Sequence, residues 1–176
     1  MILVATGTHH QPFDRLVAAA DAVAAVMAEP VVLQRGCSTR PAPHCEVHDL
    51  LPPGAFEALV GRARVVVLHG GSSSFLQARA LGHRPILVPR RPELGEHIDD
   101  HQLRFARSLG DAIVWAEPGA LLEAVQHGTR VLPGADPGAR SRAFCEAFGR
   151  LVDALCAGDG SISGSISGSR DPGGRR

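Results

Sequence analysis

Short runs of apolar residues alternate along the chain with longer segments in which apolar residues recur every three or four positions. The runs predict buried strands over residues 1–6, 31–36, 64–71, 84–90 and 112–116, with room for one short strand within 46–53. The helical spacing predicts helices over residues 13–28, 52–62, 72–82, 97–110, 118–127 and 137–156. Alternating strands and helices form βαβ units. We therefore expect an α/β fold with a Rossmann-like parallel sheet and helices on both faces.

The end of the chain has neither pattern. Residues 158–176 read GDGSISGSISGSRDPGGRR, with a repeated ISGS and too few apolar residues to pack. Such a composition is typical of disordered segments. We therefore expect one domain over residues 1–157, which is long enough for a real core, and a disordered Gly/Ser/Arg tail over residues 158–176.

Composition and charge exclude several classes of function. The 176 residues carry 18 basic and 18 acidic side chains, so no basic field indicates nucleic-acid binding. All the basic residues are Arg, and without Lys neither a Walker-type phosphate loop nor a Schiff-base enzyme is expected. No apolar run reaches the length of a membrane span, and the N-terminal MILVATG lacks the basic region of a secretory signal. We therefore expect a cytoplasmic protein.

Polar residues follow the ends of the predicted strands. In chain order these segments read GTHHQ (7–11), QRG (34–36), HGGSSS (69–74) and RR (90–91), with GEHIDDHQ (95–102) just beyond. The carboxyl ends of the strands in an open parallel sheet share one edge, and ligands bind there. We therefore expect the ligand site at this edge.

The HGGSSS segment (69–74) has the features of an anion site. Its glycines let a ligand approach the backbone, and its serines begin a predicted helix whose first amides point outward. Arg90 or Arg91 could add a cation, which makes a diphosphate the most natural ligand. A Gly-Gly-Ser turn between a strand and a helix can equally be structural, and the two arginines can equally be a solvated surface pair.

The segment GEHIDDHQ (95–102) concentrates carboxylates, imidazoles and an amide within eight residues. Many donors and acceptors in one place suit the hydroxyl groups of a sugar. A metal site is the second interpretation, because His97 and His101 are four residues apart on a predicted helix, with Asp100 beside them. The third interpretation is structural, with Asp99 and Asp100 favouring the helix N-terminus.

Three segments together resemble a known family. MILVATGTHHQPFDRLV (1–17), HGGSSSFLQARALGHRPILVPR (69–90) and GEHIDDHQLRFA (95–106) resemble, in this order, the C-terminal domain of glycosyltransferase family 28. The similarity is greatest to the small catalytic subunits of two-component N-acetylglucosaminyltransferases and to their counterparts in bacterial exopolysaccharide biosynthesis. It implies a single half of a GT-B glycosyltransferase that binds a UDP-sugar, inverts the anomeric centre, and needs no metal or other cofactor.

The resemblance and the strand-end positions together assign the site residues. Nucleotide-sugar binding falls on Gly7, Thr8, His69, Gly70, Gly71, Ser72, Ser73, Ser74, Gln77, Arg90, Glu96, Asp100, His101 and Gln102. Many relatives carry Glu where this chain has Gln77, and a Gln side chain can also hydrogen-bond ribose hydroxyls. His9 is the candidate catalytic base, because an imidazole titrates near neutral pH. His10 and a residue of a partner are the alternatives.

A GT-B enzyme has two halves, and the resemblance covers one. It implies a heteromer with a membrane-anchored, acceptor-binding glycosyltransferase subunit and a lipid-linked acceptor, which would hold the chain peripherally at the inner face of the membrane. We expect transfer of a hexosyl group, GlcNAc or a related sugar, from a UDP-sugar to a lipid-linked or polysaccharide acceptor. A non-catalytic nucleotide-sugar-binding subunit is the alternative, because Gln77 departs from the family pattern. A dinucleotide-binding protein is disfavoured, because GTHHQP is not GxGxxG.

Overall fold

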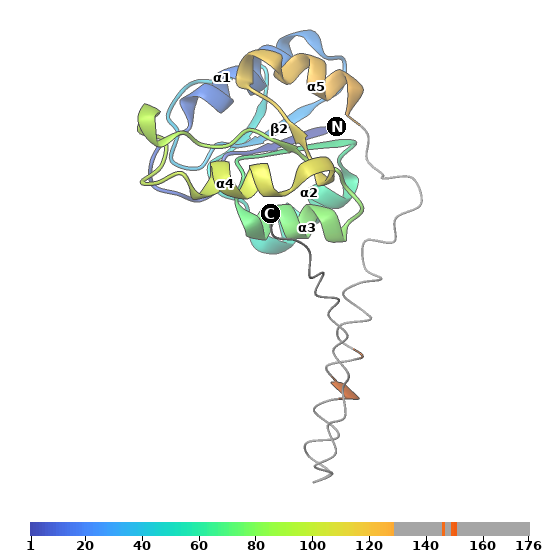
Figure 1. Cartoon of the computed structure of the whole chain (residues 1–176). Helices are drawn as coiled ribbons and strands as arrows, with labels where there is room; N and C mark the ends of the chain where they lie inside the picture. Colours follow the sequence, from blue (N-terminus) through green and yellow to red (C-terminus); the bar gives the residue numbers. More distant parts are fainter. Residues whose placement is uncertain (129–145, 147–148, 151–176) are drawn as a thin grey trace, which may run out of the picture. The chain divides into compact units, whose positions relative to one another are not determined.

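The structure is a computed structural model and describes residues 1–128, 146 and 149–150 (Figure 1). By its internal contacts the chain divides into two units, Met1–Pro137 and Gly138–Arg176. The sheet and all the helices named below belong to the first unit. Within the described ranges, no helix has both the length and the apolar character needed to cross a membrane.

The expectations for the C-terminal part of the chain fall largely outside these ranges. Of the helix expected over residues 137–156, the described residues 146 and 149–150 are helical. The domain boundary expected after residue 157 and the tail expected over residues 158–176 lie outside the described residues.

Six parallel strands form one sheet at the centre of the first unit. They are β1 (Ile2–Ala5), β2 (Val31–Gln34), β3 (Glu46–His48), β4 (Val65–Leu68), β5 (Ile86–Leu87) and β6 (Val114–Trp115). Their order across the sheet is β3-β2-β1-β4-β5-β6, and every neighbouring pair is parallel. Along the chain, β2 and β3 are added on one side of β1, and β5 and β6 are added on the far side of β4. The connections therefore diverge between β1 and β4, at the topological switch point where such sheets bind ligands.

Helices cover both faces of the sheet, which confirms the predicted Rossmann-like α/β fold (Figure 1). They are α1 (Asp14–Val26), α2 (Pro53–Arg62), α3 (Ser72–Ala80), α4 (His101–Ser108) and α5 (Leu121–His127). Three short 3-10 turns are η1 (Pro92–Leu94), η2 (Gly110–Ala112) and η3 (Pro118–Ala120).

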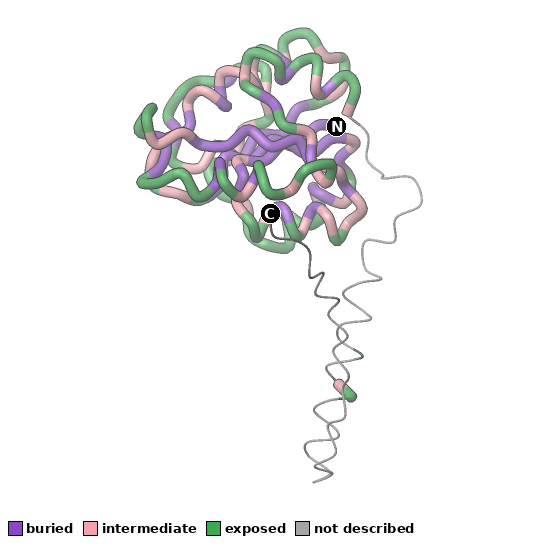
Figure 2. Tube along the Cα trace, viewed as in Figure 1, coloured by how far each residue is buried: buried purple, intermediate pink, exposed green. Residues whose placement is uncertain are grey.

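The side chains of each central strand divide between two apolar layers. In β1, Ile2 and Val4 pack into the layer that contains α1 and α5, whereas Leu3 and Ala5 pack into the layer that contains α2, α3 and α4. The strands β1, β2, β4 and β5 are therefore the buried centre of the unit in Figure 2. Because both faces of the sheet are covered, its central strands are continuous apolar runs rather than alternating ones.

One predicted boundary differs where it matters for the site. The helix expected over residues 97–110 begins only at His101. Gly95 adopts a left-handed conformation (φ +70°), and the Asp99 carboxylate accepts the His101 N–H over 3.1 Å. Residues 97–100 therefore form a bend that leads into α4, rather than its first turn.

Candidate functional site

One cavity opens at the carboxyl edge of the sheet, beside the switch point. Its volume is about 510 Å³. It is lined by Ala5, Gly7, Thr8, Gln34, Leu51, Pro53, Phe56, His69, Gly71, Ser72, Ser73, Ser74, Gln77 and His101. The wall thus comes from the ends of β1, β2 and β4 and from the starts of α2, α3 and α4. This is the edge at which the sequence predicts a ligand site.

The cavity gathers many of the residues that the sequence assigns to nucleotide-sugar binding. Those in its wall are Gly7, Thr8, His69, Gly71, Ser72, Ser73, Ser74, Gln77 and His101. Those outside its wall are Gly70, Arg90, Glu96, Asp100 and Gln102, together with the candidate base His9. Most of the HGGSSS turn thus lies in the wall of a cavity, whereas the GEHIDDHQ segment contributes only His101 to that wall.

The sequence reasoning missed the opposite wall of the cavity. Gln34 is the exception, because the sequence places QRG (34–36) at the ligand-binding edge, although Gln34 is not among the residues assigned to nucleotide-sugar binding. Leu51, Pro53 and Phe56 line the cavity where the chain enters α2. Apolar residues at a helix start look like ordinary core residues in a sequence, so no signal marked them.

The His69 imidazole is wedged against two glycines in the cavity wall. A Cβ atom on Gly7 would stand 2.6 Å from His69 Nε2, and one on Gly71 would stand 2.5 Å from it. Gly7 also has φ +85°, which disfavours any side chain. Burial lowers the pKa of His69 to about 4, and the nearby Arg90 charge acts in the same direction. The ring is therefore neutral near pH 7.

Helix α3 begins in the cavity wall. Gly71 is its N-cap residue, and no described side chain caps its first turn. Ser74 Oγ donates to the Gly71 carbonyl over 3.1 Å. The first amides of a helix have no acceptor within the helix, and the helix dipole adds positive potential there. The amides of this turn are therefore available to an anion, and Gln77 lines the same wall one turn further along.

Arg90 connects loops behind the cavity instead of facing a ligand. Its side chain is fully buried. The guanidinium donates to the carbonyls of Thr6 (2.8 and 3.2 Å), Gln11 (2.7 Å) and Glu96 (2.7 Å). These bonds occupy most of the guanidinium donors, and the predicted contact between Arg90 and a diphosphate stays a prediction. Arg91 forms ion pairs with two glutamates at the surface instead.

Glu96 likewise has protein partners. Its buried carboxylate accepts two hydrogen bonds from the Arg15 guanidinium, both of 2.8 Å, and one of 2.8 Å from the Arg91 N–H. A carboxylate with these partners holds the loop after β5 in place. The structure therefore gives Glu96 a role in positioning the loop, and its predicted contact with a sugar stays a prediction.

Asp100 and Gln102 differ in their surroundings. Asp100 is exposed and pairs with Arg104 over 3.0 Å, one turn along α4. Gln102 is buried behind the glycine turn, where a Cβ on Gly70 would stand 3.4 Å from the Gln102 Cβ. Its Oε1 atom has no hydrogen-bond partner among the described residues. Of the two, Gln102 is the one that packs against the cavity-forming turn.

Four histidine rings form a row beside the cavity. The ring centroids are 4.3 Å apart for His9 and His10, 4.3 Å for His9 and His97, and 4.6 Å for His97 and His101. Burial, and then the neighbouring His97 and His10, lower the pKa of His9 below its usual range. Burial, and then His101, lower the pKa of His97 in the same way. His9 and His97 therefore tend to stay neutral at the cavity edge.

His9 lies beside the cavity with one ring nitrogen already in use. Its Nδ1 accepts the Gln11 N–H over 3.2 Å. A neutral ring with this bond carries its proton on Nε2, so it is a donor at that atom. His9 can accept a proton only at Nδ1, after the bond to Gln11 is released.

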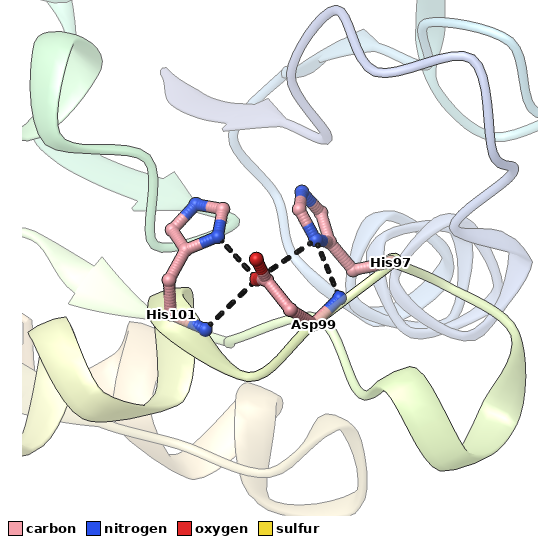
Figure 3. A group of neighbouring side chains, drawn as sticks. All are labelled: His97, Asp99 and His101. Atoms are coloured by element: carbon pink, nitrogen blue, oxygen red, sulfur yellow. Dashed lines mark hydrogen bonds and ion pairs between the residues drawn. The ribbon is translucent and has the colours of Figure 1, made fainter.

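The metal interpretation of the GEHIDDHQ segment needs a correction. Within the described residues, one group has ligand atoms close enough to share an ion, and it consists of His97, Asp99 and His101 (Figure 3). Asp99 takes the place that the sequence reasoning gave to Asp100, which pairs with Arg104 instead. His97 precedes α4, so the two histidines converge through the bend rather than along one helix face.

Comparison with known proteins agrees with the fold. Residues 1–130 match the family model of the glycosyltransferase family 28 C-terminal domain. No curated protein matches the chain. Among solved structures, CalG4, the calicheamicin glycosyltransferase, is 21% identical with a TM-score of 0.58, over 93% of this chain and 43% of that one.

Two further solved glycosyltransferases are similar to the chain. The glycosyltransferase of kitacinnamycin is 22% identical with a TM-score of 0.57, over 89% of this chain and 42% of that one. SnogD from Streptomyces nogalater is 23% identical with a TM-score of 0.50, over 89% and 43%. The chain thus has the fold of one half of a GT-B glycosyltransferase, and it spans less than half the length of these proteins.

Proposed function

Because the chain belongs to the family of glycosyltransferase family 28 C-terminal domains, we propose that it is the catalytic, donor-binding half of an inverting glycosyltransferase. It binds a UDP-sugar and transfers a hexosyl group, GlcNAc or a related sugar, to a lipid-linked or polysaccharide acceptor. The observation that carries this proposal is the opening of the cavity onto the first turn of α3, at Gly71 and residues 72–74.

The diphosphate of the donor lies against this first turn. Amide N–H groups and the helix dipole stabilise the negative charge that grows on the leaving group when the sugar departs. His69 adds shape rather than charge, because its lowered pKa keeps the ring neutral. Hydrogen-bond donors thus take the role that a metal ion has in other transferases, and transfer proceeds without a catalytic metal.

The nucleoside occupies the rest of the cavity. Gln77 hydrogen-bonds the ribose hydroxyls from the wall of α3. The uracil ring packs on the apolar side, against Leu51 and Phe56, where an aromatic face and an aliphatic side chain suit a flat ring. Gln34 supports this side, because its Oε1 accepts the Leu51 N–H over 3.2 Å.

In a GT-B enzyme the acceptor binds in a second half. The chain spans 42–43% of the length of the solved glycosyltransferases. In this proposal a separate, membrane-anchored subunit supplies the acceptor-binding half, presents a lipid-linked acceptor, and holds this chain peripherally at the inner face of the membrane. His9 acts on the acceptor hydroxyl as the catalytic base, through Nδ1, once the Gln11 N–H has released that atom.

Calorimetric titration of the full chain with UDP, UDP-sugars, ADP and NAD, with and without EDTA, tests the donor site. Gly71→Ala places a methyl group against His69 at the phosphate end. Gly119→Ala is the matched control, because open space surrounds that exposed position. We expect UDP to bind equally well in EDTA. Gly71→Ala should weaken UDP binding by about tenfold or more, and Gly119→Ala should leave it unchanged.

Each other outcome contradicts a stated part of the proposal. A preference for ADP or NAD would favour a dinucleotide-binding protein. Failure to bind UDP, both alone and with a co-expressed acceptor subunit, would remove the donor site. Tight UDP-sugar binding without transfer in the assembled complex would make the chain a non-catalytic nucleotide-sugar-binding subunit.

A further inference from the structure

Three side chains, two on the bend that leads into α4 and one at the first residue of α4, point toward one another (Figure 3). His97 Nδ1 lies 3.5 Å from Asp99 Oδ1, and His101 Nδ1 contacts the same carboxylate oxygen. One ligand atom from each residue lies within 4.8 Å of the other two. The proposed donor chemistry uses neither His97 nor Asp99, so this convergence has no role in it.

We propose that His97, Asp99 and His101 form a binding site for a divalent transition metal of the Zn²⁺ class. This goes beyond the proposed function, which needs no catalytic metal. Two imidazole nitrogens and one carboxylate oxygen suit Zn²⁺, Ni²⁺ or Cu²⁺, whereas Mg²⁺ and Ca²⁺ require mainly oxygen ligands. Three protein ligands leave the fourth tetrahedral position open to water or a ligand.

The spacing fits a tetrahedral ion. Ligands about 2.0–2.2 Å from Zn²⁺ stand about 3.3–3.6 Å apart at tetrahedral angles. The observed 3.5 Å between His97 Nδ1 and Asp99 Oδ1 is close to that value. The Asp99 N–H donates to His97 Nδ1 over 3.4 Å, so this ring nitrogen is unprotonated, and a metal ion would take the place of this hydrogen bond. Asp99 and His101 are about half exposed, which lets both side chains adjust around an ion.

One ligand of the site is held in place before any ion binds. The His97 side chain is buried, and its ring packs 4.3 Å from the ring of His9. The residue before it is anchored twice, because Arg15 pairs with the Glu96 carboxylate and Arg90 donates to the Glu96 carbonyl. Ligands fixed by such supporting contacts lose less freedom on binding, which favours a specific site over chance surface chelation.

Other histidines of the described part have different arrangements. His44 pairs with Asp21 over 3.1 Å, and His48 pairs with Glu46 over 3.0 Å. Neither pair belongs to a group of three converging ligands among the described residues. They therefore provide matched histidines for controls, each with a carboxylate partner but without a third ligand.

Zn²⁺ titration of the reduced full chain against a colorimetric zinc indicator tests the proposal. Co²⁺ replaces Zn²⁺ in a parallel experiment, in which visible absorption reports tetrahedral coordination. The variants are His101→Ala and Asp99→Ala, both at exposed positions, and the controls are His44→Ala and His48→Ala. Circular dichroism and thermal unfolding verify that each variant retains the wild-type fold.

We expect one equivalent of Zn²⁺ to bind in the presence of excess Mg²⁺, with a tetrahedral Co²⁺ spectrum. Removing His101 or Asp99 should weaken that binding by about tenfold or more, whereas the two controls should leave it unchanged. Binding that is equally strong in all variants would overturn the proposal, as would binding that Mg²⁺ displaces. UDP titration in EDTA reports the donor site separately, so failure of this metal site leaves the proposed function intact.

Discussion

The His69 ring is in direct contact with the backbone of Gly71, because a Cβ atom on Gly71 would stand only 2.5 Å from His69 Nε2. The backbone of Gly71 has φ −73°, a value that any residue adopts. A glycine is therefore needed at position 71 because the neighbouring His69 ring leaves no space for a side chain, and not because of the backbone conformation. Gly7 touches the same ring, but its φ of +85° adds a conformational requirement.

A double-mutant cycle separates these two requirements. Gly71→Ala should destabilise the wild type by about 1–3 kcal/mol, because the new methyl group has no space beside His69. In a His69→Ala background the same change should cost less, which gives a coupling energy of about 0.5–3 kcal/mol. Urea unfolding of the four proteins measures both values. Equal costs in the two backgrounds would show that the ring does not exclude the methyl group.

Gly7→Ala provides the contrast. Its cost should persist after His69→Ala, because an alanine at φ +85° is strained by about 1–2 kcal/mol whatever the space around it. If His69→Ala fully restored the unfolding free energy lost in Gly7→Ala, the backbone strain at Gly7 would contribute nothing, which would contradict this prediction.

Arg90 and Arg91 are neighbours in the sequence, but Arg90 should contribute much more to stability than Arg91. Arg90→Lys should lower the free energy of unfolding by about 3 kcal/mol or more, because a single ammonium cannot serve the carbonyls of Thr6, Gln11 and Glu96 together. Arg91→Lys should cost at most about 1 kcal/mol, since its ion pairs are at the surface. Urea unfolding of the two variants measures the difference. Similar losses would mean that the buried carbonyl bonds contribute little.

The partly buried imidazole of His69 makes stability depend on pH. Its pKa is about 4 in the folded chain against an ordinary 6.5, so the unfolded chain binds the proton first as the pH falls. The stabilisation is complete above pH 6.5 and is lost progressively toward pH 4, by up to about 3 kcal/mol. His69→Gln should lack this loss. The difference in unfolding free energy between wild type and variant should therefore shrink between pH 7 and pH 4.5, and parallel pH curves would contradict the lowered pKa.

The pH dependence of transfer tests His9 as the catalytic base. A base must be neutral, and burial together with His97 lowers the pKa of His9 below its usual 6.5. Transfer by the complex with the acceptor subunit should therefore be independent of pH near 7 and should fall on the acid side of 6.5. His9→Gln should reduce the rate by about 10²–10⁴-fold and remove the acid limb. An unchanged limb in this variant would assign the base to another residue.

Local sequence patterns predict the elements of this fold because the physical causes are local. Each apolar run is covered on both faces, so Ile2–Ala5 and Val65–Leu68 are recognisable as central strands. The strand-end rule then brings GTHH and HGGSSS to one edge without any knowledge of side-chain contacts. The cavity wall formed by Gly7, Thr8 and residues 69 and 71–74 follows directly from those two facts.

The remaining part of the site depends on contacts between segments far apart in the sequence. Nothing near Arg90 indicates that its guanidinium is buried against the carbonyls of Thr6 and Gln11, about eighty residues earlier. The partner of Glu96 is Arg15, which is equally distant. In the sequence, Arg90 and Glu96 look like ligand-binding residues because they are charged and lie near the predicted site. Only their contacts with residues far away in the sequence show that they hold the loops in place.

Ser72→Pro tests the central contact of the proposed donor site. Ser72 is the first residue of α3, where proline is tolerated, and Gly71 before it has φ −73° and ψ 133°, which suit a following proline. The substitution removes the Ser72 amide N–H from the cavity wall and leaves the helix intact. Ser72→Ala is the control, because it removes the hydroxyl and keeps the amide.

By calorimetry, Ser72→Pro should weaken UDP binding by about tenfold or more, the effect of losing one hydrogen bond to a charged group. Ser72→Ala should weaken it much less, and unfolding should show both variants within about 1 kcal/mol of wild type. Equal UDP affinity for the two variants would mean that the diphosphate does not lie against this turn.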